Sequence, residues 1–176
     1  MPHSTNTVAP VSGRRVASPA ATTTRVAVLV VAWNSVEELR VCLQSLEDDD
    51  STSICTSVFV LNNGSNAEIG ALVIDEFPCV ALINSATNLG YAAGVNAAWN
   101  EASSTIPDFD YIAVLNQDTA VTQGWLVPLV QHFDANPEVA CVQPAIVLMS
   151  DPTKVNTRGN VSHFLGFGLV TGLGTA

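Results

Sequence analysis

The chain has 176 residues, of which 48% are hydrophobic and only 12% are charged, and this length and composition suit a single domain with a buried core. Sixteen acidic residues face six basic ones, so the chain lacks the basic surface that nucleic-acid binding requires. Between residues 26 and 153 the only basic residue is Arg40, so an anionic ligand would need a cation brought from outside the chain.

The two ends of the chain differ from its middle in composition. The first 25 residues are rich in Ser, Thr, Pro and Ala without a continuous apolar segment, so we expect a disordered tail rather than a signal peptide. The longest apolar run, residues 26–33, is far too short to cross a bilayer, and the apolar C-terminal segment is interrupted by four glycines. We therefore predict a tail over residues 1–25, one domain over residues 26–176 and no transmembrane segment.

The four cysteines are widely separated, with no Cys-x-x-Cys pair. Three of them lie inside apolar runs, so we expect buried thiols rather than disulfides or zinc ligands, and this favours a reducing compartment. The residues are Cys42, Cys55, Cys79 and Cys141.

The first predicted element is a strand over residues 26–33, a continuous apolar run typical of a strand buried on both faces. Ser35 and Glu38 then fit a capping box. The helical spacing of the apolar residues that follow predicts a helix to about Glu47.

Strands and helices continue to alternate along the chain. Further strands are predicted over residues 57–61, 79–83, 111–115 and 138–142. Helices are predicted after the cap residue Asn66, over residues 91–103 and over residues 122–135, where Pro128 forces a kink or a late start. Such alternation predicts an α/β fold with a mostly parallel sheet.

Four of the apolar runs end in segments that carry asparagine. A turn is the ordinary interpretation of such residues, because Asn and Asp bond their own backbone. Repetition favours a ligand site instead, since right-handed crossovers place the strand ends along one edge of the sheet, where ligands bind. The residues are Asn34, Asn62, Asn63, Asn84, Asn88 and Asn116.

Only the last of these segments, Asn116-Gln117-Asp118, carries a carboxylate. The motifs of other classes are missing: no G-x-G-x-x-G follows the first strand, no Gly-Lys pair exists for a P-loop, and no Ser-His-Asp arrangement stands out. A lone carboxylate among amides suits a hard divalent cation, and such a cation bridges to a diphosphate. A nucleoside diphosphate ligand therefore fits the composition and the site.

The order VAVLVVAWN, VFVLNNGS, NLGYAAGVNAAW and YIAVLNQDT resembles the family 2 glycosyltransferases with a GT-A fold. It is particularly similar to the bacterial branch that includes rhamnosyltransferases, and the resemblance covers about residues 26–144. It implies a Rossmann-like sheet and transfer of a hexose, with inversion, from a nucleotide-diphospho sugar to a saccharide or lipid-linked acceptor in cell-surface polysaccharide synthesis. It also implies a divalent metal (Mg²⁺ or Mn²⁺) and a cytoplasmic location, with association at the inner face of the cell membrane left open.

The resemblance further implies which residues bind the donor. The end of the first strand contacts the nucleoside, Asn62 stands where family members usually carry a base-reading Asp, and Asp118 takes the metal-binding place of the Asp-x-Asp motif. Asn116 contacts the ribose or the donor sugar. The full predicted set is Ala32, Trp33, Asn34, Asn62, Asn88, Gly90, Asn96, Asn116 and Asp118.

Family members continue well past the length of this chain, and their later half supplies the acceptor site and a carboxylate general base. The resemblance therefore implies that the chain is the N-terminal, donor-binding half. Asp134, Glu138 and Asp151 follow the metal motif, and none has the context of that base, so no catalytic residue is assigned. The alternative is a module, or an inactive fragment, that binds a nucleotide sugar without transferring it.

Overall fold

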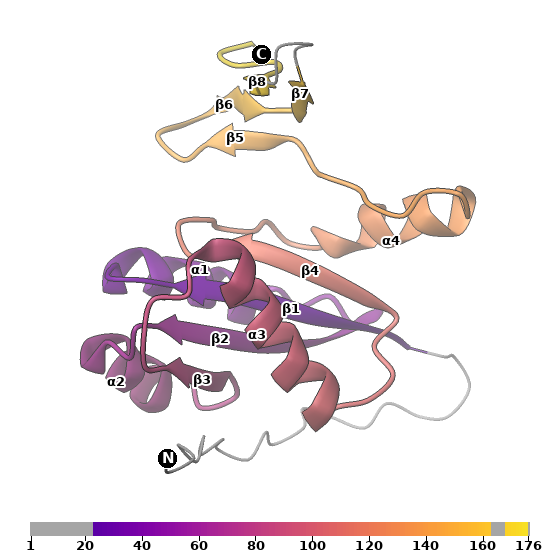
Figure 1. Cartoon of the computed structure of the whole chain (residues 1–176). Helices are drawn as coiled ribbons and strands as arrows, with labels where there is room; N and C mark the ends of the chain where they lie inside the picture. The colour runs from indigo at the N-terminus through magenta and orange to yellow at the C-terminus, as the bar shows by residue number, and fades with distance from the viewer. Residues whose placement is uncertain (1–22, 163–167, 176) are drawn as a thin grey trace. The chain divides into compact units, whose positions relative to one another are not determined.

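The computed structural model describes residues 23–162 and 168–175, and its elements fall into two compact units that divide after Gln123 (Figure 1). Residues 1–22, most of the predicted tail, lie outside the described residues. Within the described ranges, every helix is too short or too polar to span a bilayer.

The first unit alternates strand and helix throughout, as predicted. Its elements are β1 (Thr24–Ala32), α1 (Val36–Asp48), β2 (Ile54–Asn63), α2 (Ala67–Glu76), β3 (Ala81–Ser85), α3 (Tyr91–Thr105) and β4 (Tyr111–Asn116).

Side-chain capping is present at one of the two predicted helix starts. Asn66 caps α2, because its side chain accepts hydrogen bonds from the backbone N–H groups of Glu68 and Ile69. Ser35 is the N-cap residue of α1, so the predicted position of this helix start is confirmed, but its hydroxyl donates to the Glu38 carboxylate and makes no capping bond to a backbone N–H group. The predicted capping box is therefore replaced by a bond between the two side chains.

The described part of the second unit contains one helix and short antiparallel strand pairs, β5 with β6 and β7 with β8. Pro128 lies in the first turn of α4, where its missing N–H group is tolerated, so the predicted late start is confirmed. The strand predicted over residues 138–142 is wrong, because that apolar run pairs with no other segment of the described chain. The elements are α4 (Leu126–Ala135), β5 (Ile146–Leu148), β6 (Asp151–Thr157), β7 (Asn160–Ser162) and β8 (Gly168–Val170).

The sheet of the first unit has four parallel strands in the order β3-β2-β1-β4. The predicted α/β fold with a mostly parallel sheet is therefore confirmed. The chain moves from β1 outward to β2 and β3, and then returns to place β4 on the opposite side of β1. In open parallel sheets, this reversal of strand order marks the crevice in which ligands bind.

Helices cover both faces of this sheet, with α3 on one face and α1 and α2 packed together on the other (Figure 1). The central strand β1 is buried on both faces from Val26 to Ala32, which explains its uninterrupted apolar sequence. Alternate β1 residues pack with small α3 residues in one hydrophobic cluster, which includes Ala27, Leu29, Val31, Ala98 and Ala102.

The close approach of α3 to the sheet depends on Gly94. A Cβ atom added at this residue would lie 3.1 Å from both Leu61 Cδ2 and Val31 Cγ1, tighter than ordinary packing. Gly94→Ala gains up to about 1 kcal/mol of helix propensity, but overpacking a core costs about 1–3 kcal/mol. We expect a net loss of stability, measured as a lower urea midpoint of unfolding.

Gly70 in the interior of α2 provides the matched control. Its added Cβ would meet only Asn62 Nδ2, at an ordinary 3.9 Å. Gly70→Ala should therefore raise the urea midpoint, since helix propensity improves by about 0.5–1 kcal/mol without crowding. Equal shifts in the two variants would show that packing at Gly94 is loose.

The cysteine prediction is corrected by the structure. All four cysteines are free, as predicted, but only Cys42 is buried. Cys55 lies near the start of β2, ahead of its buried segment, and Cys79 lies in the turn before β3, so an apolar sequence context did not translate into burial. Cys141 is exposed in the second unit.

Candidate functional site

The strand exits of β1 and β4 adjoin at the point where the strand order reverses. Their register ends with Val31 opposite Asn116, so the segments that follow both strands leave the sheet side by side. The predicted residues Trp33, Asn34 and Asp118 all lie in these two segments. We therefore expect the ligand site predicted from the sequence to lie between the exits of β1 and β4.

The side chain of Gln117 joins the two exits. Its Oε1 accepts a hydrogen bond from the backbone N–H of Trp33 at 2.6 Å, and its Nε2 donates to the carbonyl oxygen of the same residue at 3.1 Å. Gln117 is not among the predicted site residues. Its partner lies 84 residues away in the sequence, and no local pattern points to it.

The β1 exit presents one aromatic ring and one amide. The Trp33 side chain is 53% exposed although its backbone is held by Gln117. Asn34 is exposed and has a φ of 59°, a left-handed conformation that asparagine tolerates better than most residues. Ala32 is fully buried, so it can offer a ligand only its backbone.

Asn62 is only 1% exposed and its amide is engaged within the protein. Its Nδ2 donates to the carbonyl of Asn66 at 2.8 Å and to Oδ1 of Asn84 at 2.9 Å, while its Oδ1 accepts from the N–H of Asn66 at 2.9 Å. These bonds use both amide hydrogens and close the turn between β2 and α2. The turn accounts for this side chain without a ligand.

Asn63 organises the loop before α3 in a similar way. It is 3% exposed, its Nδ2 donates to Oδ1 of Asn88 at 3.0 Å, and its Oδ1 accepts from the N–H of Leu89 at 2.8 Å. Asn88 Oδ1 also accepts from the N–H of Gly90 at 2.8 Å. The predicted residues Asn88 and Gly90 are therefore exposed but held in place. Asn63, which the sequence placed at a strand end but outside the donor-binding set, is buried and holds this loop.

The N-terminal turn of α3 lies beyond the ends of the central strands. Gly94 packs on Val31, near the end of β1, so Tyr91 lies one helical turn further toward the strand exits. The Tyr91 side chain is 51% exposed, and the predicted residue Asn96 is also exposed on this helix. Asn116 pairs with Val31 and so has its side chain on the α3 face of the sheet.

The Asp118 carboxylate is exposed, and no described residue bonds or ion-pairs with it. Its charge reaches two neighbours. Burial first, and Asp118 second, raise the pKa of the Tyr91 hydroxyl and raise the pKa of the Cys42 thiol to about 12. Asp118 therefore lies within electrostatic reach of the start of α3 and the middle of α1, with Tyr91 and Cys42 both protonated at neutral pH.

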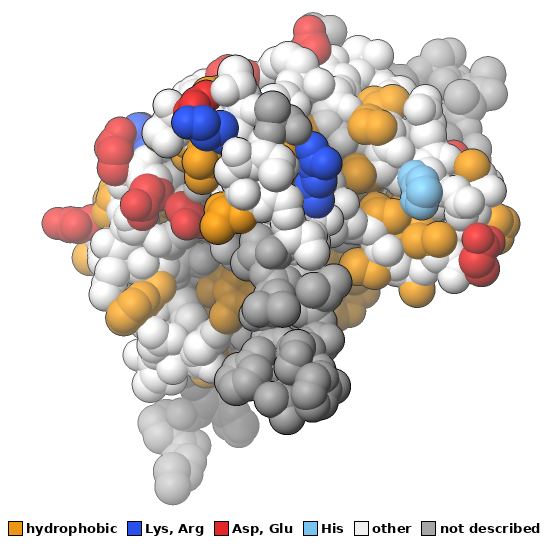
Figure 2. All heavy atoms as spheres, turned by 90° about the horizontal axis from the view of Figure 1, so that it is seen from above, with side chains coloured by type: hydrophobic (Ala, Val, Ile, Leu, Met, Phe, Trp, Pro, Cys, Tyr) orange, Lys and Arg blue, Asp and Glu red, His pale blue; other side chains and the backbone are white. Residues whose placement is uncertain are grey.

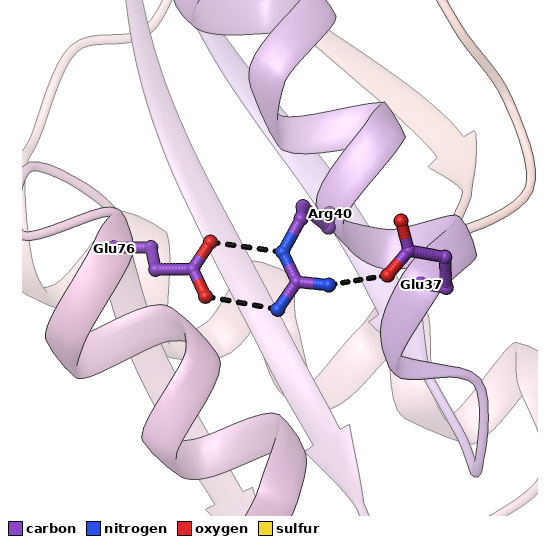
Figure 3. A network of polar contacts seen from close by, with 3 residues as sticks. All are labelled: Glu37, Arg40 and Glu76. Carbon is purple, nitrogen blue, oxygen red and sulfur yellow. Dashed lines mark hydrogen bonds and ion pairs between the residues drawn. The ribbon is translucent and has the colours of Figure 1, made fainter.

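Neither basic side chain in the described part of the first unit is free to serve this crevice. Arg40 donates two hydrogen bonds, each 2.9 Å long, to Glu76 on α2 and a further one to Glu37, and Figure 3 shows this bridge between α1 and α2. Arg25 is at the start of β1, 5.6 Å from the ring centroid of Phe109, at the opposite end of the strand. In the view from above in Figure 2, acidic, basic and hydrophobic side chains all reach the surface.

The residues around Asp118 fit one kind of metal site. Among the described residues, no group of three or more His, Cys, Asp and Glu side chains could hold a metal ion. This excludes a cage built from those side chains there. Mg²⁺ is commonly bound by one or two carboxylates, waters and substrate phosphates, and a single free carboxylate suits that mode.

Two comparisons with known proteins bear on this arrangement. The family model described as glycosyl transferase family 2 matches residues 27–170. A search of curated proteins finds no match to the chain.

Proposed function

The chain belongs to glycosyl transferase family 2, and from this we propose that its first unit binds a nucleotide-diphospho sugar at the crevice between the exits of β1 and β4. Its four-stranded parallel sheet flanked by helices is consistent with the GT-A, Rossmann-like fold. Membership in this family supports a glycosyltransferase in general.

One observation carries the proposal: a half-exposed aromatic ring and a carboxylate without a bonding partner among the described residues lie on two strand exits that are hydrogen-bonded to each other. Trp33 offers a flat apolar surface for a nucleoside, and Asp118 offers a hard anionic oxygen on the adjoining exit. A ligand with a base at one end and a diphosphate at the other matches both features.

Asp118 would hold the divalent cation, Mg²⁺ or Mn²⁺. When bound, the cation neutralises charge that develops on the departing nucleoside diphosphate. Because Arg25 and Arg40 are engaged elsewhere, the described part of the first unit contributes at this place the carboxylate and neutral donors. The hydroxyl of Tyr91, half-exposed and within electrostatic reach of Asp118, is such a donor.

The proposed set of donor-binding residues differs from the predicted one at two points. We retain Trp33, Asn34, Asn96, Asn116 and Asp118 as side-chain contacts, with Ala32 limited to its backbone and with Asn88 and Gly90 as the edge of the crevice. Tyr91 is added. Asn62 is reassigned to the turn, because its amide hydrogens are already bonded within the protein.

We propose the following reaction for the family's chemistry here. An acceptor hydroxyl oxygen attacks the anomeric carbon, the new glycosidic bond forms as the anomeric carbon–phosphate oxygen bond breaks, and the nucleoside diphosphate leaves with that electron pair. Inversion follows from attack opposite the leaving group. A base takes the acceptor proton, and we assign that base to no residue.

The sequence resemblance to the rhamnosyltransferase-like branch supports a saccharide or lipid-linked acceptor. It also supports a role in cell-surface polysaccharide synthesis, at the cytoplasmic side of the membrane.

The test is isothermal titration of the protein with UDP and dTDP, each with and without Mn²⁺. We expect binding that weakens when EDTA removes the metal. Equal affinity with and without metal would overturn the role of Asp118, and absence of binding to either nucleotide would overturn the donor site. Release of nucleoside diphosphate from nucleotide sugars, with and without saccharide acceptors, separates transfer from binding alone.

A further inference from the structure

Gln117 stands between two proposed ligand-contacting residues, Asn116 and Asp118, but its own amide is turned away to the β1 exit. We propose that Gln117 is a positioning residue that couples the nucleoside half of the site, at Trp33, to the metal half, at Asp118. This inference rests on the proposed function and concerns how the two halves of that site are held together.

In this contact the side-chain amide of Gln117 takes the place that the backbone of a neighbouring strand would have. The backbone pairing of β1 with β4 has its last partners at Val31 and Asn116, and Trp33 is the first residue after β1. At Trp33 the Gln117 amide supplies one acceptor and one donor to the N–H and C=O of the same residue. It thereby continues the ladder beyond the point at which the backbones stop pairing.

The same contact restrains the metal-binding turn. Gln117 lies inside the turn closed by the Thr119 N–H and the Asn116 carbonyl at 3.2 Å, so anchoring its side chain limits how far Asp118 can swing. Leucine at this position has a similar size and can make neither hydrogen bond, so the two exits would be joined only through the sheet. A ligand that bridges both exits would then have to order them on binding, and this ordering would reduce its affinity.

The chain contains a matched control for this substitution. Gln123 also clamps a backbone segment, because its Nε2 donates to the carbonyl of Asp48 at 2.5 Å and its Oε1 accepts from the N–H of Asp50 at 3.2 Å. This clamp holds the loop after α1, and none of its partners belongs to the proposed site. Gln123→Leu removes two bonds of the same kind without touching the crevice.

The coupling is measured as a ratio of dissociation constants. For each protein, the Kd of UDP and of dTDP without metal is divided by the Kd with saturating Mn²⁺, and this ratio reports how strongly metal and nucleoside assist each other. We expect Gln117→Leu to lower the ratio roughly tenfold, within the usual range for coupled sites. Gln123→Leu should leave the ratio unchanged.

A measurement without ligand distinguishes a local effect at Trp33 from a general loss of stability. Hydrogen exchange of the Trp33 backbone amide, followed by NMR in the absence of nucleotide, should become faster in Gln117→Leu and stay unchanged in Gln123→Leu. An unchanged ratio in Gln117→Leu, with the wild type binding nucleotide in a metal-dependent way, would overturn the coupling and leave the proposed function standing. If the wild type bound neither UDP nor dTDP, both proposals would fall.

Discussion

Asp118→Ala is expected to abolish the dependence of nucleotide binding on Mn²⁺. The variant should bind UDP or dTDP with metal no better than the wild type binds it without metal. Loss of a residue that only supports a metal ligand already lowers metal affinity about 10–100-fold. Removal of the carboxylate that is proposed to bind the metal should lower the metal-dependent affinity by at least the upper end of that range.

The physical reason is the charge of the first unit. Both of its described basic side chains, Arg25 and Arg40, are committed to other contacts, so neither can take over when the metal is lost. The charged diphosphate would then enter a site whose other proposed polar contacts are neutral amides and the Tyr91 hydroxyl. Because Asp118 makes no hydrogen bond with the described residues, its removal should leave the unfolding midpoint unchanged.

Two variants serve as controls for Asp118→Ala. Asp118→Asn keeps the size of the side chain and removes its charge, so it should resemble the alanine variant if charge is what matters. Asp134→Ala removes an exposed carboxylate on α4 and should preserve metal-dependent binding. Metal-dependent affinity that survives both Asp118 substitutions would place the metal elsewhere.

Asn62→Ala is expected to lower the free energy of unfolding by about 1–3 kcal/mol, the usual cost of leaving buried polar partners unsatisfied. The substitution removes three hydrogen bonds, leaves the N–H and C=O of Asn66 without their partner, and opens space beneath the turn before α2. Urea unfolding measures the change.

Measurements of nucleotide binding distinguish a turn-forming role of Asn62 from a base-reading role. If Asn62 only holds the turn, Asn62→Ala should weaken UDP and dTDP binding by the same factor. Asn96→Ala is the matched control for stability, because Asn96 is exposed on α3 and its removal should change the free energy of unfolding by less than about 0.5 kcal/mol. A loss of affinity in Asn62→Ala that depended on the base, at unchanged stability, would restore the base-reading role.

Local signals in the sequence account for the elements that were predicted well. The continuous apolar run of β1 is a consequence of burial on both faces, and Asn66 can cap α2 without any distant contact. The α/β fold follows from their alternation. Strand pairing was less predictable. Residues 138–142 have a strand-like composition but pair with no segment of the described chain. The local sequence of a strand does not specify whether a partner strand lies beside it.

Burial also escaped local prediction where it depends on neighbours. The run over residues 111–115 has the composition of a fully buried strand, but β4 alternates between partly buried and exposed residues, with Ile112 and Val114 exposed. Both pair with β1 residues that contact α3, and α3 itself lies over β1 and β2, so helical cover is densest one strand away from them. Which strand receives that cover depends on where the crossover helix packs.

The sequence alone determined that amide-bearing strand exits meet at one edge of a parallel sheet and that Asp118 is the carboxylate among them, because strand direction and residue identity are local properties. Only the tertiary structure decided what each amide does. Asn62 and Asn63 are neighbours of identical chemistry, but one closes the turn before α2 and the other holds the loop before α3. Gln117 reaches a residue 84 positions away. A side-chain amide bonds whatever the fold brings within about 3 Å of it, and that is set by the packing of strands and helices rather than by the order of residues along the chain.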